Sequence, residues 1–195
     1  MPVLTTDRLT LREWRDDDLD MLAALNADPE VMRYIRDGSV LTREESAERL
    51  QKMMRDWSEN GFGLFPVEVR ATGELIGWAG LAVPLFLPQV LPAVEIGWRL
   101  SRDAWGHGYA TEAAAAALEF AFDEVGLDRL ISIRHVDNHR SARVMEKLGL
   151  TPSFTTTAPD GGRPLVVHAR SNDSPVLDHL TGTSRPASPP GRSAD

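Results

Sequence analysis

The hydrophobic positions of the chain follow two periods, and the period changes several times along the sequence. Apolar residues that alternate with polar ones, or that form short runs, are typical of strands. Pro66 inside one of these segments indicates an edge or a bulge. The strands predicted in this way are Leu9–Leu11, Gly63–Arg70, Leu75–Leu81, Val94–Leu100, Leu130–Val136, Thr151–Thr157 and Pro164–Arg170.

Apolar residues spaced three and four apart predict helices in the remaining segments. Thr42 and Glu45 form a capping box at the start of the first long helix, and Asn60-Gly61 ends it. The shorter helices predicted before it run from Asp16 to Ala27 and restart at Asp28-Pro29-Glu30. Helices and strands thus alternate in the manner of an α/β fold.

An alanine-rich helical pattern, WGHGYATEAAAAALEFAF, runs from Trp105 to Phe122 directly after the strand Val94–Leu100. Two glycines, Gly106 and Gly108, stand at its start. A helix start presents unpaired N–H groups with a partial positive charge, and glycines let a bulky anion approach these groups. The pattern therefore predicts a pyrophosphate site. A tight turn without a ligand is the alternative that the glycines alone leave open.

A second motif, NHRSARVMEKLG, runs from Asn138 to Gly149. Asn138 is a favourable N-cap and Gly149 is favourable just after a helix end, so a short helix is predicted between them. Ser141 falls on the stripe that this helix must bury. Its hydroxyl is either satisfied inside the helix or available for chemistry, and the pattern leaves both interpretations open.

Composition narrows the class of protein. The 195 residues include 21 Lys and Arg and 29 Asp and Glu, which gives a formal net charge of −8. This charge argues against a general binder of nucleic acid or anionic membrane, and it is compatible with a cationic, amine-bearing substrate. There is no cysteine, which excludes disulfides, a thiolate nucleophile and a cysteine metal site. No apolar run approaches membrane-spanning length, so we expect a cytoplasmic protein. We also expect that the protein holds no metal.

The order GWRL, WGHGYATEA and NHRSARVMEKLG resembles the GNAT superfamily of acetyl-CoA-dependent N-acyltransferases, and within it the RimJ/RimL-type branch. The resemblance runs from about Thr6 to about Arg170. It implies a mixed, mostly antiparallel sheet flanked by helices. The strands Val94–Leu100 and Leu130–Val136 would splay apart to admit the cofactor. The family loop pattern R/Q-x-x-G-x-G/A has Asp103 at its first position here.

The resemblance also implies which residues hold acetyl-CoA. Backbone N–H groups of the loop would meet the pyrophosphate, and the preceding strand would pair with the pantetheine arm and donate to the thioester carbonyl. Asn138 matches a family position that contacts the cofactor, and plain N-capping is its alternative role. The other residues implied are Gly106, His107, Gly108, Tyr109 and Ala110 in the loop and Ile96, Trp98 and Leu100 in the strand.

Amine acetylation needs a deprotonated amine, a polarised carbonyl and a donor for the departing thiolate. Many members of the family use a tyrosine as this donor, whereas the RimJ/RimL-like branch uses a serine, and Ser141 matches its position. Glu95 is the first candidate for the base because it lies on the strand that borders the gap. His135 is the second candidate, since the pKa of histidine suits the task. A solvated strand glutamate and a structural histidine are the alternatives.

The leading hypothesis is therefore an N-acetyltransferase that moves an acetyl group from acetyl-CoA to a primary amine. The acceptor would be a protein or peptide N-terminus or a small molecule, and the protein would be a monomer or homodimer. A non-catalytic acyl-CoA-binding module on the same fold is the alternative. A nicotinamide-dependent enzyme is disfavoured because Thr111 occupies the third glycine position of the dinucleotide motif.

The domain organisation follows from composition. We expect one acyltransferase domain over residues 1–180 and a disordered tail rich in Ser and Pro over 181–195. The segment 83–92 is apolar and broken by three prolines. We expect this segment to fold back and pack on its own domain. The alternatives are that it forms a wall of the acceptor pocket or a dimer contact.

Overall fold

The computed structural model describes residues 2–159 and 162–173, so the expected tail lies outside the described residues. One sheet runs through the described part in the order β1-β2-β3-β4-β5-β6-β8-β7. Every predicted strand is present to within one or two residues, and only β1 was not predicted. The strands are β1 (Leu4–Thr5), β2 (Leu9–Leu11), β3 (Leu64–Val69), β4 (Glu74–Ala82), β5 (Glu95–Leu100), β6 (Arg129–His135), β7 (Thr151–Thr157) and β8 (Pro164–Ser171).

The helices also follow the predicted pattern. The capping box of Thr42 and Glu45 is formed, and Gly61 ends α3 in the left-handed conformation with φ 73°. The helix expected from Asp16 begins instead as a 3-10 turn, and α1 starts after Asp18. The helices are η1 (Asp16–Asp18), α1 (Leu19–Ala27), α2 (Pro29–Met32), α3 (Arg43–Asn60), η2 (Pro88–Val90), η3 (Arg102–Ala104), α4 (Tyr109–Asp123) and α5 (His139–Lys147).

Pro66 lies inside β3, where its missing N–H matters least. The short strand β2 pairs with β3 only as far as Val67, and one further contact, from the Arg12 N–H to the Pro66 carbonyl, follows at 3.4 Å. A register shift between Val67 and Glu68 marks the neighbouring bulge. Of the two predicted alternatives, an edge or a bulge, the bulge is present, while β3 lies between β2 and β4 in the sheet.

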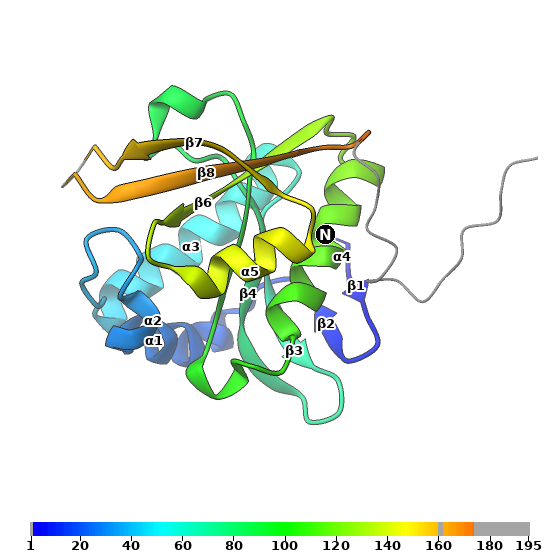
Figure 1. Ribbon diagram of the computed structural model, residues 1–195. Coiled ribbons are helices and arrows are strands. Elements are labelled where there is room, and N and C mark those ends of the chain that lie inside the picture. The colour runs from blue at the N-terminus through cyan, green and yellow to red at the C-terminus, as the bar shows by residue number, and fades with distance from the viewer. Residues whose placement is uncertain (1, 160–161, 174–195) are drawn as a thin grey trace, which may run out of the picture.

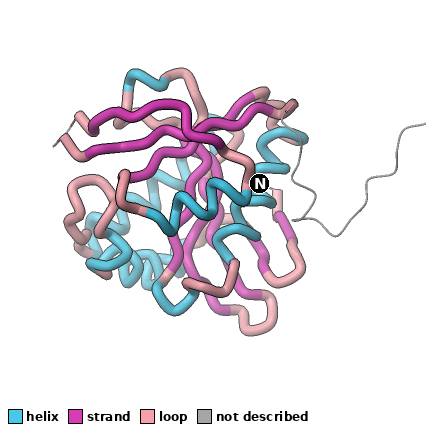
Figure 2. The backbone as a smooth tube through the Cα atoms, in the orientation of Figure 1, coloured by secondary structure: helices cyan, strands magenta, loops and turns pink. Residues whose placement is uncertain are grey.

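The sheet is covered on both faces, as Figures 1 and 2 show. On one face α4 packs against β4 and β5 through alanines, and Ala113, Ala117 and Ala121 are fully buried. Small side chains let this helix lie close to the strands, which brings the start of α4 near the end of β5. On the other face a separate cluster joins residues of α1, α2 and α3 to Trp78 of β4.

The neighbouring parallel strands β5 and β6 pair only at Glu95 and Ile131. The Ile131 N–H donates to the Val94 carbonyl at 3.0 Å. Two residues further on, the Ile133 N–H donates to the Glu95 carboxylate at 3.3 Å instead of to the backbone of β5. The strands diverge from this point, and in Figure 1 β6, β7 and β8 run across the picture while β3 and β4 run up and down it. The predicted splay of the two central strands is confirmed.

The apolar loop between β4 and β5 folds back on the sheet only in part. Leu87 is fully buried in a cluster with Ile131 and Val167, which confirms that part of the expectation. Leu85 and Phe86 remain 65% and 52% exposed. The loop is therefore anchored mainly by Leu87, while three large apolar side chains, Leu85, Phe86 and the 39% exposed Leu91, remain in contact with water.

Candidate active site

The glycine loop, residues 105–108, joins η3 to α4. Gly106 and Gly108 have φ of 82° and 83°, a left-handed conformation that side chains rarely adopt. Helix α4 therefore begins only at Tyr109, and no side chain caps its first turn. A Cβ added at Gly106 would meet no atom within 4 Å. The first-turn N–H groups thus remain unpaired beside open space, an arrangement that fits a pyrophosphate.

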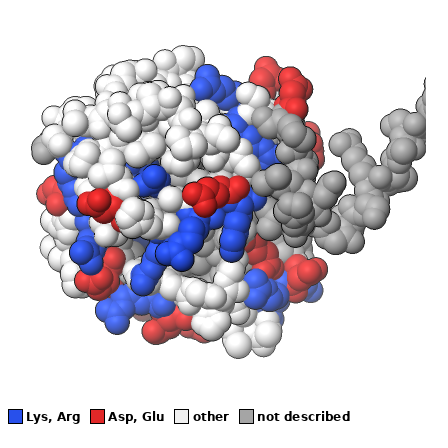
Figure 3. Space-filling view, in the orientation of Figure 1, with Lys and Arg blue, Asp and Glu red and all other residues white. Residues whose placement is uncertain are grey.

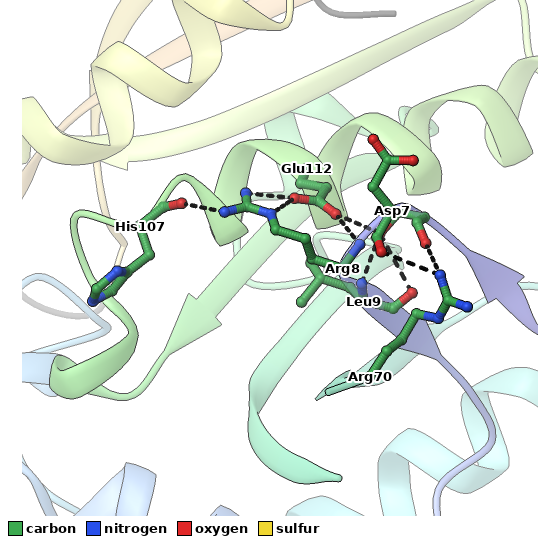
Figure 4. A network of polar contacts seen from close by, with 7 residues as sticks. Asp7, Arg8, Leu9, Arg70, His107 and Glu112 are labelled. Carbon is green, nitrogen blue, oxygen red and sulfur yellow. Dashed lines mark hydrogen bonds and ion pairs between the residues drawn. The ribbon is translucent and has the colours of Figure 1, made fainter. Parts of the chain in front are cut away.

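The loop is braced by the N-terminal hairpin, as Figure 4 shows. Arg8 pairs with Glu112 at 2.5 Å and donates a further hydrogen bond to the His107 carbonyl at 3.0 Å. The Thr6 hydroxyl donates to the same carboxylate at 2.6 Å, and the Arg8 backbone N–H donates to it at 2.9 Å. Glu112 therefore ties the first turn of α4 to the segment that joins β1 and β2.

Two further contacts involve the aromatic ring of Tyr109. The Arg8 guanidinium lies 4.7 Å from its centre, and the His107 ring stacks on it at 5.7 Å. Although burial opposes ionisation, the hydrogen bonds from Thr6 and Arg8 prevail and lower the pKa of Glu112. Sequence reasoning gave Glu112 no chemical role and missed Arg8 and Thr6, because contacts between segments a hundred residues apart leave no local pattern.

The second motif lies beside this loop. The Asn138 side chain accepts a hydrogen bond from the Ser141 N–H at 3.1 Å, so its capping role is present. Ser141 is half-buried, and its hydroxyl forms no hydrogen bond within the described residues. The Arg140 guanidinium stacks 4.4 Å from the centre of the Trp105 ring, and Trp105 Nε1 donates to the Leu100 carbonyl at 2.9 Å. These contacts join α5, the glycine loop and β5.

Glu95 lies where β5 and β6 begin to diverge. Burial raises its pKa to about 7, while the hydrogen bond from the Ile133 N–H opposes that rise. A carboxylate that titrates near neutral pH is suited to accept a proton from an amine. Of the two candidate bases, Glu95 is the one that faces the gap between the central strands.

His135 has contacts that indicate a structural role. It is 8% exposed, its ring stacks on Tyr34 at 5.3 Å, and its Nδ1 accepts a hydrogen bond from the Asp137 N–H at 3.2 Å. One ring nitrogen is therefore already engaged at the end of β6. These contacts favour the interpretation of His135 as a packed and hydrogen-bonded residue over its assignment as the base.

The strand β5 offers unpaired backbone to the gap. The Val94 carbonyl points toward β6, and alternation along the strand directs the peptide groups of Ile96 and Trp98 to the same side. The side chains of Ile96 and Leu100 are buried against α4. These residues can therefore meet a ligand through their backbone while their side chains build the core.

Sequence reasoning missed two residues on the opposite face of the same strands. These residues are Arg99 of β5 and Trp78 of β4. Arg99 lies 5.0 Å over the Trp78 ring and donates to Asn26 Oδ1 at 2.8 Å. The only signal in the sequence is a charged residue in a central strand, which does not reveal its partners.

Two other findings concern the described residues only. No cluster of three or more His, Cys, Asp or Glu side chains that could hold a metal is found within residues 2–159 and 162–173. None of the helices in this part of the chain combines the length and the apolar character needed to cross a membrane.

Comparison with known proteins identifies the class. Residues 8–151 match the acetyltransferase (GNAT) domain family. The N-acetyltransferase YnaD of Bacillus subtilis is 35% identical over 147 residues, which cover 75% of this chain and 81% of YnaD. An acetyltransferase structure from Agrobacterium tumefaciens superimposes with a TM-score of 0.74 at 30% identity, over 87% of this chain and 94% of that one.

The chain therefore belongs to the GNAT acetyltransferase family, and it is an acyltransferase enzyme. Solved neighbours include RimL, a ribosomal L7/L12 α-N-protein acetyltransferase in complex with coenzyme A. It has a TM-score of 0.71 at 15% identity, over 87% of this chain and 98% of RimL. At that identity the likeness establishes the fold alone. The resemblance inferred from the two sequence motifs is thus confirmed, and acetyl-CoA is the acyl donor that the family uses.

Proposed function

We propose that this protein transfers an acetyl group from acetyl-CoA to a primary amine by direct attack of the amine on the thioester. The observation that carries the proposal is the position of Glu95, a carboxylate with a pKa of about 7 at the point where β5 and β6 diverge. The open start of α4 and the free hydroxyl of Ser141 support it from the other side of the gap.

The chain's own residues fit the donor substrate. Unpaired N–H groups around Gly106, Gly108 and Ala110 suit the pyrophosphate, and Asn138 lies at the start of the adjoining helix. In Figure 3 basic side chains gather over α5, where Arg140 and Lys147 are exposed. Acetyl-CoA supplies the activated acyl group, a thioester whose carbonyl carbon the amine attacks.

Each step then has a residue of stated function. Glu95 would accept the proton that the amine loses as its nitrogen bonds to the carbonyl carbon. Backbone N–H groups of β5 at Ile96 and Trp98 face the gap and would donate to the carbonyl oxygen as it gains charge. Ser141 would donate a hydrogen bond to the sulfur as the carbon–sulfur bond breaks, and coenzyme A would leave as the thiolate, which takes up a proton from solvent.

The acceptor would be either a protein or peptide N-terminus or a small-molecule amine. Both carry a primary amine whose nitrogen can attack the thioester while Glu95 accepts the proton that it loses. The relatives of this chain share the transfer reaction, and fold alone does not decide which amine a family member uses.

The test is to measure release of coenzyme A thiol from acetyl-CoA with a panel of amines and peptides. The chain contains no cysteine, so a thiol-reactive dye reports the product without background from the protein. Ser141→Ala should lower kcat by about 100-fold or more, because the departing thiolate loses its donor. Ser58→Ala, on the exposed side of α3, is the matched control and should leave kcat unchanged.

Binding is tested separately by thermal unfolding. Acetyl-CoA at about 100 times its Kd should stabilise the fold by about 2.7 kcal/mol, and NAD should give no shift. Absence of any shift with acetyl-CoA, together with no thiol release from any amine, would overturn the proposal. A shift without thiol release would instead favour an acyl-CoA-binding module.

A further inference from the structure

Two buried hydrogen-bond donors on neighbouring strands have no acceptor. Trp78 Nε1 on β4 and Arg99 Nε on β5 are fully buried atoms without a partner among the described residues. The two residues are directly opposite each other in the antiparallel ladder. Buried donors are nearly always satisfied in folded proteins, so two adjacent exceptions indicate a missing acceptor, either ordered water or a ligand.

Three of the other four indoles of the chain donate their N–H to a backbone carbonyl. Trp14 Nε1 and Trp57 Nε1 both donate to the Leu64 carbonyl, at 2.8 and 3.0 Å. Trp105 Nε1 donates to the Leu100 carbonyl at 2.9 Å. Each of these three indoles has a backbone acceptor within reach, whereas Trp78 points its N–H to a place where the described chain offers none.

The charge around Arg99 is also uncompensated. Its described contacts are Asn26 Oδ1 at 2.8 Å and Met32 Sδ at 3.4 Å, and no carboxylate lies within 4 Å. Burial, followed by the charges of Arg49 and Arg36, lowers the pKa of Arg99 to about 10. The guanidinium thus stays charged at neutral pH in a positive field, which an anion would relieve.

This charge lies on the same face of β5 as the candidate base. We name Trp78, Glu95, Gly97 and Arg99 the acceptor face, and all four keep partial exposure although they belong to central strands. Gly97 is opposite Gly80 in the ladder, so no side chain of either residue separates Glu95 from Arg99. The Cα atoms of Glu95 and Arg99 are four residues apart, about 13 Å along a strand. Between them, the edge of the Trp78 ring lies 3.7 Å from the position of a Cβ at Gly97.

We infer that the acceptor face recognises an amine that carries an anionic group, a carboxylate or a phosphate, and that Arg99 and Trp78 donate hydrogen bonds to that group. This inference rests on the proposed function, since it assigns the amine end of the same molecule to Glu95. A planar guanidinium stacked on an indole presents donors in a fixed direction, which suits the two oxygens of a carboxylate or phosphate.

The first experiment is a titration that does not depend on turnover. Protein labelled with ¹⁵N at tryptophan should give five indole N–H signals, one for each tryptophan of the chain, and Trp78→Phe assigns the relevant one. With coenzyme A present, the probes are free amino acids against their carboxamides, and phosphoethanolamine against ethanolamine. The Trp78 indole signal should shift with a carboxylate or a phosphate probe, and the neutral partner of that probe should leave it in place.

The second experiment measures kcat/KM for the same pairs. Arg99→Gln should lower kcat/KM for the anionic amine by about 10- to 100-fold, the effect of losing a hydrogen bond to a charged group, and should change the neutral partner little. Arg99→Lys keeps the charge but not the planar fork and should recover part of the loss. Arg129→Gln, an exposed arginine at the start of β6, is the matched control.

Three outcomes would overturn the inference. The Trp78 signal would remain unmoved by every anionic probe, as expected if water satisfies both donors. Neutral amines would be acetylated as well as their anionic partners. Arg99→Gln, or Arg99→Lys if the former does not fold, would affect both members of a pair equally. In the last two cases amine acetylation itself stands, so a failure of this inference is distinct from a failure of the proposed function.

Discussion

The two sides of the gap between β5 and β6 are built in opposite ways. On the side of the glycine loop, charged groups have partners within the chain. The Glu112 carboxylate, for example, accepts hydrogen bonds from Thr6 and Arg8. On the acceptor face, Trp78 and Arg99 keep buried donors that no described residue satisfies. The charged side chains that hold the glycine loop are thus paired without a ligand, whereas buried donors of the acceptor face are not.

This difference has a physical basis. A pyrophosphate is recognised by backbone N–H groups, whose direction depends on the loop conformation, so the loop must be held by contacts that persist without ligand. A variable acceptor is recognised by side chains, and groups that will bind it must stay free of partners inside the protein. The predictions below test this contrast, from the largest expected effect to the smallest.

Glu95→Gln should lower kcat by about 100- to 10,000-fold, because the amide cannot accept the amine proton. In the wild type, kcat/KM should rise with pH through about 7 as Glu95 ionises, and the variant should lose this step. Burial raises the pKa of Glu95 in the folded state. The free energy of unfolding should therefore fall as the pH rises from the ordinary glutamate pKa through about 7, and Glu95→Gln should not show this fall. The pH–rate profiles test the kinetic prediction, and thermal unfolding at several pH values tests the stability prediction.

Glu119→Gln is the control for this prediction. Burial, followed by the charge of Asp123, also raises the pKa of Glu119, but the residue lies on α4 outside the proposed site. A kcat loss in Glu119→Gln equal to that in Glu95→Gln would remove the catalytic assignment and leave a general effect of replacing a carboxylate.

Arg8→Ala should weaken the glycine loop. It removes hydrogen bonds to the Glu112 carboxylate and to the His107 carbonyl, and we expect a loss of about 1–3 kcal/mol in unfolding free energy with a higher KM for acetyl-CoA. The pKa of Glu112 is lowered in the folded state, so its carboxylate stabilises the fold at pH values above the ordinary glutamate pKa. This stabilisation should be lost as the pH falls through the lowered pKa.

Arg43→Ala is the matched control for Arg8→Ala. Its ion pair with Asp20 is mostly exposed, so the loss should not exceed about 0.5 kcal/mol. Equal losses in the two variants, or an unchanged KM for acetyl-CoA in Arg8→Ala, would show that the hairpin does not brace the loop. Denaturant unfolding and initial-rate kinetics provide both measurements.

Trp57→Phe should cost more stability than Trp78→Phe in the absence of ligand, by about 1 kcal/mol. The Trp57 indole loses a hydrogen bond to the Leu64 carbonyl, whereas the Trp78 indole has none to lose. Denaturant unfolding of the two variants gives the difference directly. If Trp78→Phe is the more damaging change, its N–H is already satisfied by ordered water.

Arg140→Gln should have the smallest effect, about two- to fivefold in KM for acetyl-CoA, the worth of an exposed cation–π contact. If Arg140 meets the 3′-phosphate, the loss should be absent with acetyl-dephospho-coenzyme A as donor. An equal loss with both donors would assign the effect to packing on Trp105.

Much of the fold was readable because it depends on local pattern. Alternation located the strands to within two residues, and the capping box of Thr42 and Glu45 formed as expected. The prediction that Asp16 is the N-cap of a helix was wrong, and α1 starts only at Leu19. The Asp18 carboxylate instead accepts a hydrogen bond from the Arg15 N–H and pairs with Arg12 at 2.8 Å. A competing carboxylate two residues further along the chain outweighed the N-cap preference of Asp16 there.

The amino-acid sequence by itself determined the elements, the glycine loop and the positions of Glu95 and Ser141, since these follow from spacing along one segment. Only the tertiary structure decided which distant groups meet. Arg8 reaches Glu112 across 104 residues, and Arg99 reaches Asn26 across 73, while the Nε1 atom of Trp78 and the Nε atom of Arg99 have no acceptor among the described residues. Hydrogen bonds depend on distance and direction in space, and chain separation does not encode either of them.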